Sequence, residues 1–220
     1  MGPQCVNCPG KFCSIGVKNE AILPDYCPIK TSKDLIEKMA EKYFSEEIHD
    51  FYLASALNEK EAYDEDAARK RGEIVPVRPR IREIVEFAKK IGVEKIGVAF
   101  CSGLRDEAER VARIFERHGL KVYSVICCCG ALDKTRLGVP PEYKIFDPEK
   151  FESACNPILQ AELLNNAGTE INVIVGLCVG HDMLFTKYSK AYVTTLIVKD
   201  RFTGHNPVIT LYSRYHKDLI

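Results

Sequence analysis

The cysteines are the residues of this chain best suited to chemistry, and the ten of them fall into two groups. The first group consists of Cys5, Cys8, Cys13 and Cys27, and the second consists of Cys101, Cys127, Cys128, Cys129, Cys155 and Cys178. In a small secreted domain this number would indicate disulfides, whereas in a cytosolic chain it is more typical of metal ligands or reactive thiols. So many exposed thiols also suggest an anaerobe or another low-oxygen setting, since thiolates are readily oxidised.

The first group has the spacing C-x2-C-x4-C-x13-C. A C-x2-C pair lets two thiolates reach one metal from a tight turn, and two further cysteines complete tetrahedral thiolate ligation. Cys8 and Cys27 are each followed by proline, as in ferredoxin motifs, where the ring bends the chain away from the cluster. The pattern favours a [4Fe–4S] cluster and leaves zinc as the alternative, in a structural or electron-carrying role.

The composition limits the classes of partner that the chain is built to bind. It has 220 residues, of which 46% are hydrophobic, with 31 basic and 31 acidic side chains and a formal net charge of zero. We therefore expect one well-buried core, or a core with a small appendage, and no global attraction to nucleic acid or to a membrane surface. No secretory signal and no apolar run of about 18 residues is present, so we expect a cytoplasmic protein.

Hydrophobic periodicity predicts three segments along the chain. Residues 1–30 are expected to be a loop-rich, metal-binding segment, residues 31–75 a helical segment, and residues 76–220 an α/β domain. In the last segment, apolar strands alternate with amphipathic helices. Strands are expected at 95–100, 121–127, 171–177 and 192–198, and helices near 81–91, at 105–118, from 157 and at 181–189. This order favours a Rossmann-like, mostly parallel sheet of about four to five strands with helices on both faces.

The second group of cysteines lies where these strands end. Cys101 ends the first strand, Cys127–Cys129 end the second, Cys178 ends the third, and Cys155 precedes a helix. Ligands of open parallel sheets gather outside the carboxyl ends of the strands, so we expect these thiols to share one crevice. The cofactor ligands expected there are Cys101, Cys127, Cys129, Cys155 and Cys178. Buried, unreactive thiols are the alternative, and the pattern does not choose among the members of the triplet.

Three residues near these ligands are candidates for catalysis. His181 and Asp182 follow Cys178 at a helix start and are expected to manage protons, while Cys128 would be a spare thiol that relays sulfide. His181 has two other interpretations, a metal ligand or an ordinary helix-start residue, and Asp182 has one, a capping residue. Arg201 carries no specific signal, and the expectation for it is solvated surface.

Together these motifs resemble a known group of proteins. The residues that carry the resemblance are the four N-terminal cysteines, Cys101-Ser102-Gly103-Leu104, Cys127-Cys128-Cys129-Gly130 and Gly176-Leu177-Cys178-Val179-Gly180-His181-Asp182. The chain resembles an uncharacterised "predicted metal-binding protein" family of bacteria and archaea, a domain-of-unknown-function family. What the resemblance implies is metal binding, without a defined reaction.

The function expected from the residues is that of an iron–sulfur enzyme. Three cysteines would hold a [4Fe–4S] cluster with one iron open to a small-molecule substrate, for lyase, hydrolase or sulfur-transfer chemistry, and the chain would carry one or two clusters. One alternative is an electron-transfer protein with a redox partner protein. Another is a zinc or redox sensor, or a metal carrier. No G-x-G-x-x-G follows a strand, so dinucleotide binding is not expected, and the oligomeric state stays open.

Overall fold

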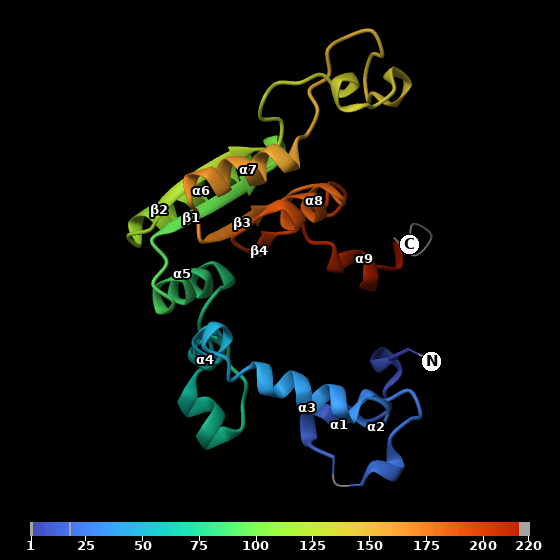
Figure 1. The fold of residues 1–220 in the computed structure, drawn as a ribbon, viewed down its shortest axis with the longest axis vertical. Coiled ribbons are helices and arrows are strands. Elements are labelled where there is room, and N and C mark those ends of the chain that lie inside the picture. Colours follow the sequence, from blue (N-terminus) through green and yellow to red (C-terminus); the bar gives the residue numbers. More distant parts are fainter. Residues whose placement is uncertain (1, 18, 216–220) are drawn as a thin grey trace. The chain divides into compact units, whose positions relative to one another are not determined.

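The structure, a computed structural model, describes residues 2–17 and 19–215. The chain forms two compact units, residues 1–57 and residues 58–220, which are described separately (Figure 1). The boundary falls inside a helix, α4, which spans Glu46–Glu61. The three segments divided at residues 30 and 75 stay a prediction.

Unit 1 is made of short helical pieces followed by two longer helices. The cysteine-rich segment contains 3-10 turns at Cys5–Asn7 and Glu20–Ile22 and two single-turn helices, α1 (Phe12–Ile15) and α2 (Pro28–Thr31). It is therefore not the simple loop that its composition suggests. Helix α3 (Lys33–Lys42) and helix α4 follow, within residues 31–75, where the sequence predicts a helical segment.

Unit 2 is built on a parallel sheet. Its described residues form four strands, β1 (Lys95–Phe100), β2 (Lys121–Ile126), β3 (Ile171–Val175) and β4 (Tyr192–Ile197), in the order β2-β1-β3-β4. All three pairings are parallel. The five residues of β3 are all buried, because this strand is central and both of its faces are covered. The predicted α/β fold with a parallel sheet is confirmed.

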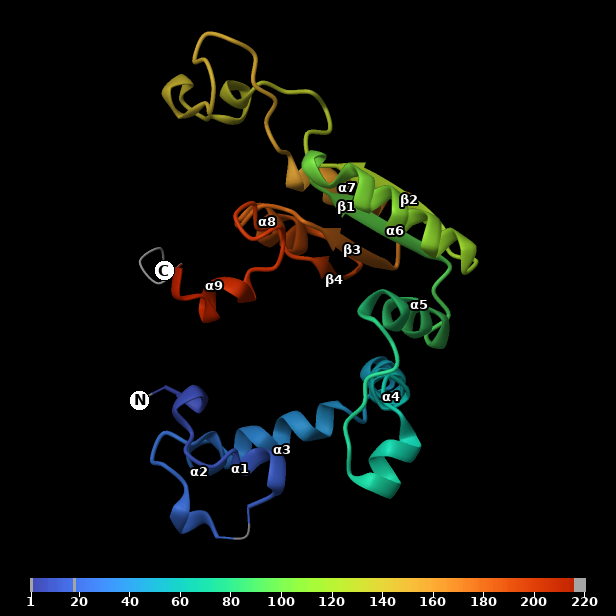
Figure 2. The same ribbon diagram turned by 180° about the vertical axis from the view of Figure 1, so that it is seen from behind.

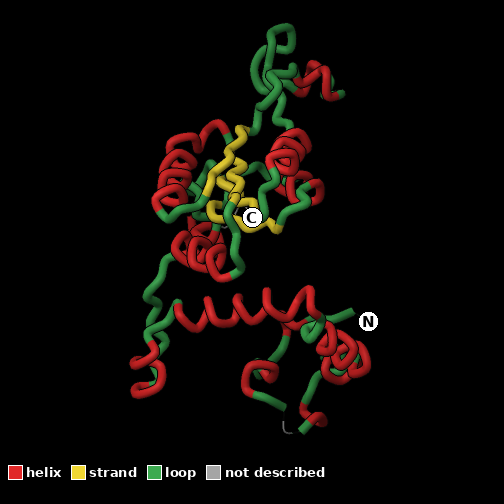
Figure 3. The backbone as a smooth tube through the Cα atoms, turned by 60° about the vertical axis from the view of Figure 1, so that its left-hand side comes forward, coloured by secondary structure: helices red, strands yellow, loops and turns green. Residues whose placement is uncertain are grey.

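Helices cover both sides of this sheet, as Figure 3 shows. They are α5 (Arg80–Lys90), α6 (Arg105–Arg117), α7 (Pro157–Ala167) and α8 (His181–Tyr188), and a short helix α9 (Val208–Tyr212) follows β4. The core between helices and sheet includes the fully buried Phe115, Leu104 and Phe185. Helix α7 begins as predicted, with Pro157 in its first turn and the Asn156 side chain accepting a hydrogen bond from Leu159 N at 3.1 Å.

The order of the strands places a switch point between β1 and β3. From β1 the chain passes through α6 to β2 on one side, whereas from β3 it passes through α8 to β4 on the other side. At such a point the loops that follow the two central strands diverge and leave a crevice outside their carboxyl ends. Residues that directly follow β1 and β3 therefore border the place where an open α/β sheet binds its ligand.

Between β2 and α7 the chain makes an excursion, residues 131–154, which projects beyond the end of the sheet (Figures 1 and 2). It contains 3-10 turns at Lys134–Leu137 and Pro141–Tyr143. Its base is held by the Asp133 carboxylate, which accepts hydrogen bonds from Thr135 N at 2.9 Å and Glu152 N at 2.8 Å. An ion pair from Lys144 to Asp133 (3.2 Å) and another between Lys134 and Glu152 complete this polar base.

Loss of the Asp133 carboxylate is expected to loosen the excursion without unfolding the sheet. The backbone N–H of Thr135, then that of Glu152, the Thr135 hydroxyl and Lys144 hold the pKa of Asp133 well below its usual range. A carboxyl whose folded-state pKa is depressed stabilises the fold above its ordinary pKa, and this contribution disappears as pH falls through the lowered value. In Asp133→Ala, hydrogen–deuterium exchange within residues 131–154 should become faster, while exchange in β1 and β3 stays unchanged.

Asp147 provides the matched control, because it is an acid of the same excursion whose partners are Glu149 N and the exposed Lys150. Asp147→Ala should change exchange much less than Asp133→Ala. Equal effects of the two substitutions would show that Asp133 does not hold the base of the excursion.

Candidate functional site

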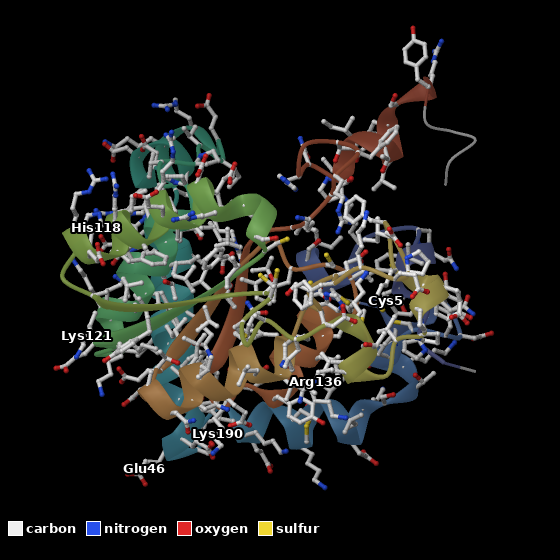
Figure 4. The ribbon with its side chains drawn as sticks, turned by 90° about the horizontal axis from the view of Figure 1, so that it is seen from above. Cys5, Glu46, His118, Lys121, Arg136 and Lys190 are labelled. Atoms are coloured by element: carbon white, nitrogen blue, oxygen red, sulfur yellow. The ribbon has the colours of Figure 1, made fainter. Side chains whose placement is uncertain are left out.

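Three sulfur atoms meet outside the carboxyl ends of the strands. Cys101 follows β1 and Cys127 follows β2, and both are buried. The Cys127 thiol is within hydrogen-bonding range of both Cys101 and Cys155. The backbone N–H of Ser102 also donates to Cys127 Sγ at 3.3 Å. We call Cys101, Cys127 and Cys155 the thiol row. Figure 4 draws the side chains as sticks with sulfur in yellow, and several sulfur atoms appear near the middle of this view.

Backbone hydrogen bonds fix Cys155 beside Cys127, although 27 residues separate them in the chain. Asn156 N donates to the Cys127 carbonyl oxygen at 2.7 Å, and Ala154 N donates to the Leu132 carbonyl oxygen at 2.8 Å. These bonds close the excursion immediately before α7 begins. Cys155 thus enters the row through the closure of this loop.

Interactions along the row shift the pKa values of its three thiols in different directions. The hydrogen bond from Cys127 lowers the pKa of Cys155, despite burial and neighbouring thiols. The bond from Cys101 has the largest single effect on the pKa of Cys127 and lowers it, but the bond to Cys155 and burial together outweigh it, so the pKa of Cys127 is raised. The bond to Cys127, followed by burial, raises the pKa of Cys101 to about 12, against the opposing influence of Lys199. Cys155 is therefore the first of the three to become a thiolate.

The other members of the second cysteine group surround the row. Cys178, in the turn between β3 and α8, and Cys128 are close enough to Cys155 to influence its charge. Cys129 directs its thiol toward the Asn156 carbonyl oxygen at 3.8 Å, and burial raises its pKa. The triplet forms a turn, closed by Cys129 N donating to the Ile126 carbonyl oxygen at 3.2 Å, so strand alternation does not apply to it.

His181 and Asp182, the predicted proton carriers, are the first two residues of α8. Their backbone N–H groups donate to the Cys178 carbonyl oxygen at 2.9 and 3.1 Å. The Asp182 carboxylate accepts from Met183 N at 2.8 Å. His181 Nδ1 is buried without a hydrogen-bond partner among the described residues. Both residues border the site through Cys178, and their catalytic roles stay predictions.

Two cations at the site were not anticipated by the sequence patterns. Lys199 and Arg201 follow β4, and Lys199 Nζ lies 2.8 Å from Cys101 Sγ while Arg201 Nη2 lies 3.0 Å from Cys178 Sγ. The expectation of solvated surface for Arg201 was therefore incomplete, since the exposed side chain bonds a thiol of the site. The signal that could have found them is their position after the fourth strand, at the same edge as the cysteines.

Gln160 of α7 was also not anticipated. Its side chain is fully buried, and its Nε2 donates to the carbonyl oxygens of Val125 at 2.8 Å and Phe100 at 3.4 Å. These carbonyls lie at the ends of β2 and β1, just before the cysteines. Gln160 thus ties together the two strand ends that carry Cys101 and Cys127.

The four cysteines of unit 1 line one pocket. Its volume is about 430 Å³, and it is bordered by Cys5, Cys8, Cys13 and Cys27 together with Phe12, Pro24 and Tyr26. The Tyr26 hydroxyl donates to the Asn7 carbonyl oxygen at 2.7 Å, which holds the Cys27 segment beside the C-x2-C turn. Backbone N–H groups of Gly10 and then Phe12, with Lys11, lower the pKa of Cys8. N–H groups directed at a sulfur are also what stabilises a metal-bound thiolate.

The cysteines predicted as metal ligands are not arranged around a metal position in either unit as the structure describes them. Among residues 2–17 and 19–215, no three or more His, Cys, Asp or Glu side chains are arranged so that they could hold a metal ion as they stand. In unit 2 the sulfurs of the row face one another through hydrogen bonds, so metal binding would replace thiol protons and rotate side chains.

Within the same described residues, no helix is long and apolar enough to cross a bilayer.

Comparison with known proteins places the chain in a family. Residues 27–196 match the family described as "Protein of unknown function (DUF1847)", a range that contains all six cysteines of the second group. The chain is also 38% identical over 213 residues to "Uncharacterized protein MJ0455" of Methanocaldococcus jannaschii, covering 97% of this chain and 95% of that protein. The resemblance to an uncharacterised family of unknown function is thereby confirmed. The chain belongs to the DUF1847 family.

Proposed function

We propose that this protein is an iron–sulfur enzyme whose active site lies at the carboxyl ends of the strands in unit 2. The observation that carries the proposal is the thiol row: Cys101, Cys127 and Cys155 come from three separate places in the chain, and the Cys127 thiol interacts with both of the others at the carboxyl ends of β1 and β2. Ligand pockets of open α/β folds form outside the carboxyl ends of the strands. Three neighbouring thiols supply soft thiolate ligands, a donor set that suits iron.

The surroundings of the row favour a cluster that carries negative charge. Ser102 N donates to Cys127 Sγ, and the Lys199 ammonium lies against Cys101 Sγ. Hydrogen bonds and cations at ligand sulfurs stabilise anionic iron–sulfur clusters and tune their reduction potentials. We assign the row as the ligands of one [4Fe–4S] cluster, which would offer one iron without a cysteine to the sulfur of a small-molecule substrate.

The residues around the row then have separate tasks. Cys178 is partly exposed and stays outside the row, so it is free to contact the substrate, and His181 lies three residues beyond it. The reaction class that needs no further reactant than water is hydrolytic desulfuration. A thiocarbonyl compound and water give the carbonyl compound and hydrogen sulfide: the carbon–sulfur bond breaks, a carbon–oxygen bond forms, and both protons of water end on sulfur. His181 is proposed to move these protons.

The pocket in unit 1 is proposed to hold a second thiolate-bound metal. Its four cysteines and the N–H groups around Cys8 support a structural or electron-relay [4Fe–4S] cluster, with zinc as the alternative. This second metal is separate from the reaction at the strand ends.

One competing function is favoured by a specific contact. The thiols of Cys127 and Cys155 interact with each other, and neighbouring thiols are candidates for a reversible disulfide, as in a redox sensor. Mass spectrometry of the air-exposed protein separates the two functions. A reversible Cys127–Cys155 disulfide in a chain that takes up no iron would support the sensor and contradict the enzyme.

Metal analysis of the anaerobically purified chain tests the proposal. We expect roughly four iron and four sulfide per cluster. Serine substitution of Cys101, Cys127 and Cys155 together should remove one cluster, and substitution of the four unit 1 cysteines should remove the other metal. Cys129→Ser is the control, since its thiol bonds a backbone carbonyl. Iron and sulfide that do not fall when the row is substituted would overturn the assignment.

A further inference from the structure

Lys199 and Arg201 stand out because both direct their charge at sulfur. Lys199 Nζ lies 2.8 Å from Cys101 Sγ, and Arg201 Nη2 lies 3.0 Å from Cys178 Sγ. Within the described part of the chain, neither side chain forms an ion pair with a carboxylate, whereas most cations of the excursion do. Lys199 and Arg201 thus place two positive charges without ion-pair partners among the described residues at the carboxyl end of β4, where a ligand is expected.

The acids nearest to them in the chain are engaged elsewhere. Asp200 lies between the two cations, but its carboxylate accepts from Phe202 N at 2.9 Å and from the Thr203 hydroxyl at 2.6 Å. Asp182, four residues after Cys178, accepts from Met183 N. Each carboxylate therefore accepts hydrogen bonds within its own turn, and neither forms an ion pair with Lys199 or Arg201.

Lys199 lies beside the turn after β1, and the other cation, Arg201, is accessible to solvent. A Cβ at Gly103 would lie 3.3 Å from Lys199 Nζ, which places the ammonium directly beside the turn after β1. Arg201 is exposed and Cys178 is partly exposed, so a solute can reach both. Arg201 uses one terminal nitrogen on Cys178, and its planar guanidinium retains other N–H groups for a carboxylate.

We propose that Lys199 and Arg201 form an anion-binding subsite, and that the ligand of the strand-end site is a small thio compound carrying a carboxylate. The sulfur end of this ligand rests on the function proposed above, whereas the carboxylate end rests on the two cations alone. A cluster held by three thiolates carries a single negative charge in its common oxidised form. The attraction for an anion is therefore assigned to direct hydrogen bonds and charge from Lys199 and Arg201, and not to the net charge of the filled site.

A pair of alkylating reagents tests the carboxylate end without any metal. Iodoacetate is anionic and iodoacetamide is its neutral counterpart, and both alkylate a thiolate by forming a sulfur–carbon bond as iodide leaves. Both reagents react with the same thiolate, so the fraction of thiolate cancels when their rates at one cysteine are divided. The ratio then reports the preference of the site for the anionic reagent. The full chain, reduced and stripped of metal, is treated with each reagent, and alkylation of each cysteine is followed by peptide mass spectrometry.

We expect the iodoacetate-to-iodoacetamide rate ratio at Cys178 to exceed that at the exposed Cys5 by about tenfold or more, since local fields of this kind raise encounter rates by 10 to 10³. Arg201→Gln and Lys199→Gln should each lower the ratio, and the double variant should bring it to the value at Cys5. Lys187→Gln removes an exposed cation of α8 and should leave the ratio unchanged. High salt should reduce the preference.

Equal ratios at Cys178 and Cys5, or a preference that survives the double substitution, would overturn the subsite. The sulfur end is tested on cluster-loaded protein, where mercaptoacetate should perturb the cluster absorption at lower concentration than neutral mercaptoethanol, and equal potency would refute the thio-carboxylate ligand. The two proposals fail separately. A chain without iron that still prefers iodoacetate refutes the enzyme alone, and a chain with iron and no such preference refutes the subsite alone.

Discussion

Removal of the metal proposed for unit 1 is expected to unfold its cysteine-rich segment while the sheet of unit 2 stays folded. Among the described residues of this segment, Leu23 and Cys27 are buried, whereas Val6, Ile15 and Ile22 are 94%, 73% and 56% exposed. So little apolar burial does not offset the conformational entropy of ordering some thirty residues. Thiolate–metal bonds supply about 10 kcal/mol or more in small segments of this kind.

Hydrogen–deuterium exchange with and without a strong chelator measures this effect. Amides of residues 2–17 and 19–31 should become unprotected after chelation, and those of β1 and β3 should keep their protection, because unit 2 has its own core. The variant with Cys5, Cys8, Cys13 and Cys27 changed to serine should be unprotected in this segment even before chelation. Full protection of the segment in that variant would show that the metal is not what folds it.

The second large effect is expected at Gly97, in the middle of β1. A Cβ at this position would overlap Asn172 Oδ1 and lie 2.9 Å from Leu164 Cδ1. Asn172 cannot move away easily, because it is fully buried, accepts from the Thr169 hydroxyl at 2.8 Å and donates to the Ser189 hydroxyl at 2.8 Å. In open space Gly→Ala stabilises a chain, whereas here it overpacks the core and breaks a buried polar network.

Gly97→Ala should therefore lower the free energy of unfolding of unit 2 by about 3 kcal/mol, the combined scale of overpacking and an unsatisfied buried polar group. Thermal unfolding should show a decrease in Tm of about 6–12 °C for a chain of this size. The control is a double-mutant cycle with Asn172→Ala, which removes the overlapping atom. The double variant should be more stable than the sum of the single effects by about 1 kcal/mol or more. Strict additivity would show that the two residues do not clash.

Local sequence patterns predicted much of unit 2. The apolar runs at 95–100 and 171–175 are strands because both of their faces are covered, and Asn156-Pro157 begins a helix because asparagine caps it and proline fits its first turn. The placement of Cys101, Cys127 and Cys178 at one edge follows from the parallel arrangement. These inferences use only neighbours in the chain and the general rule for open α/β sheets.

What the sequence could not predict depends on contacts between distant residues. The contact of Lys199 with Cys101 spans 98 positions, and Gln160 meets Phe100 and Val125 only through the packing of α7 on the sheet. The individual orientations within Cys127–Cys129 follow from a turn, which period-two alternation does not describe. The helical turns among the first thirty residues were missed because segments of three or four residues have no periodicity to read.

The closure of the excursion makes its tip replaceable. Lys134 N donates to the Glu152 carbonyl oxygen at 2.9 Å, Ala154 N to that of Leu132 and Asn156 N to that of Cys127. These backbone bonds join the two ends of the excursion before α7 begins. These three backbone bonds involve no residue between 135 and 151, and the side chains of that range that contribute to the base are those of Thr135 and Lys144, at Asp133. The length of the segment between these contacts can therefore change without moving the backbone on either side of Cys155.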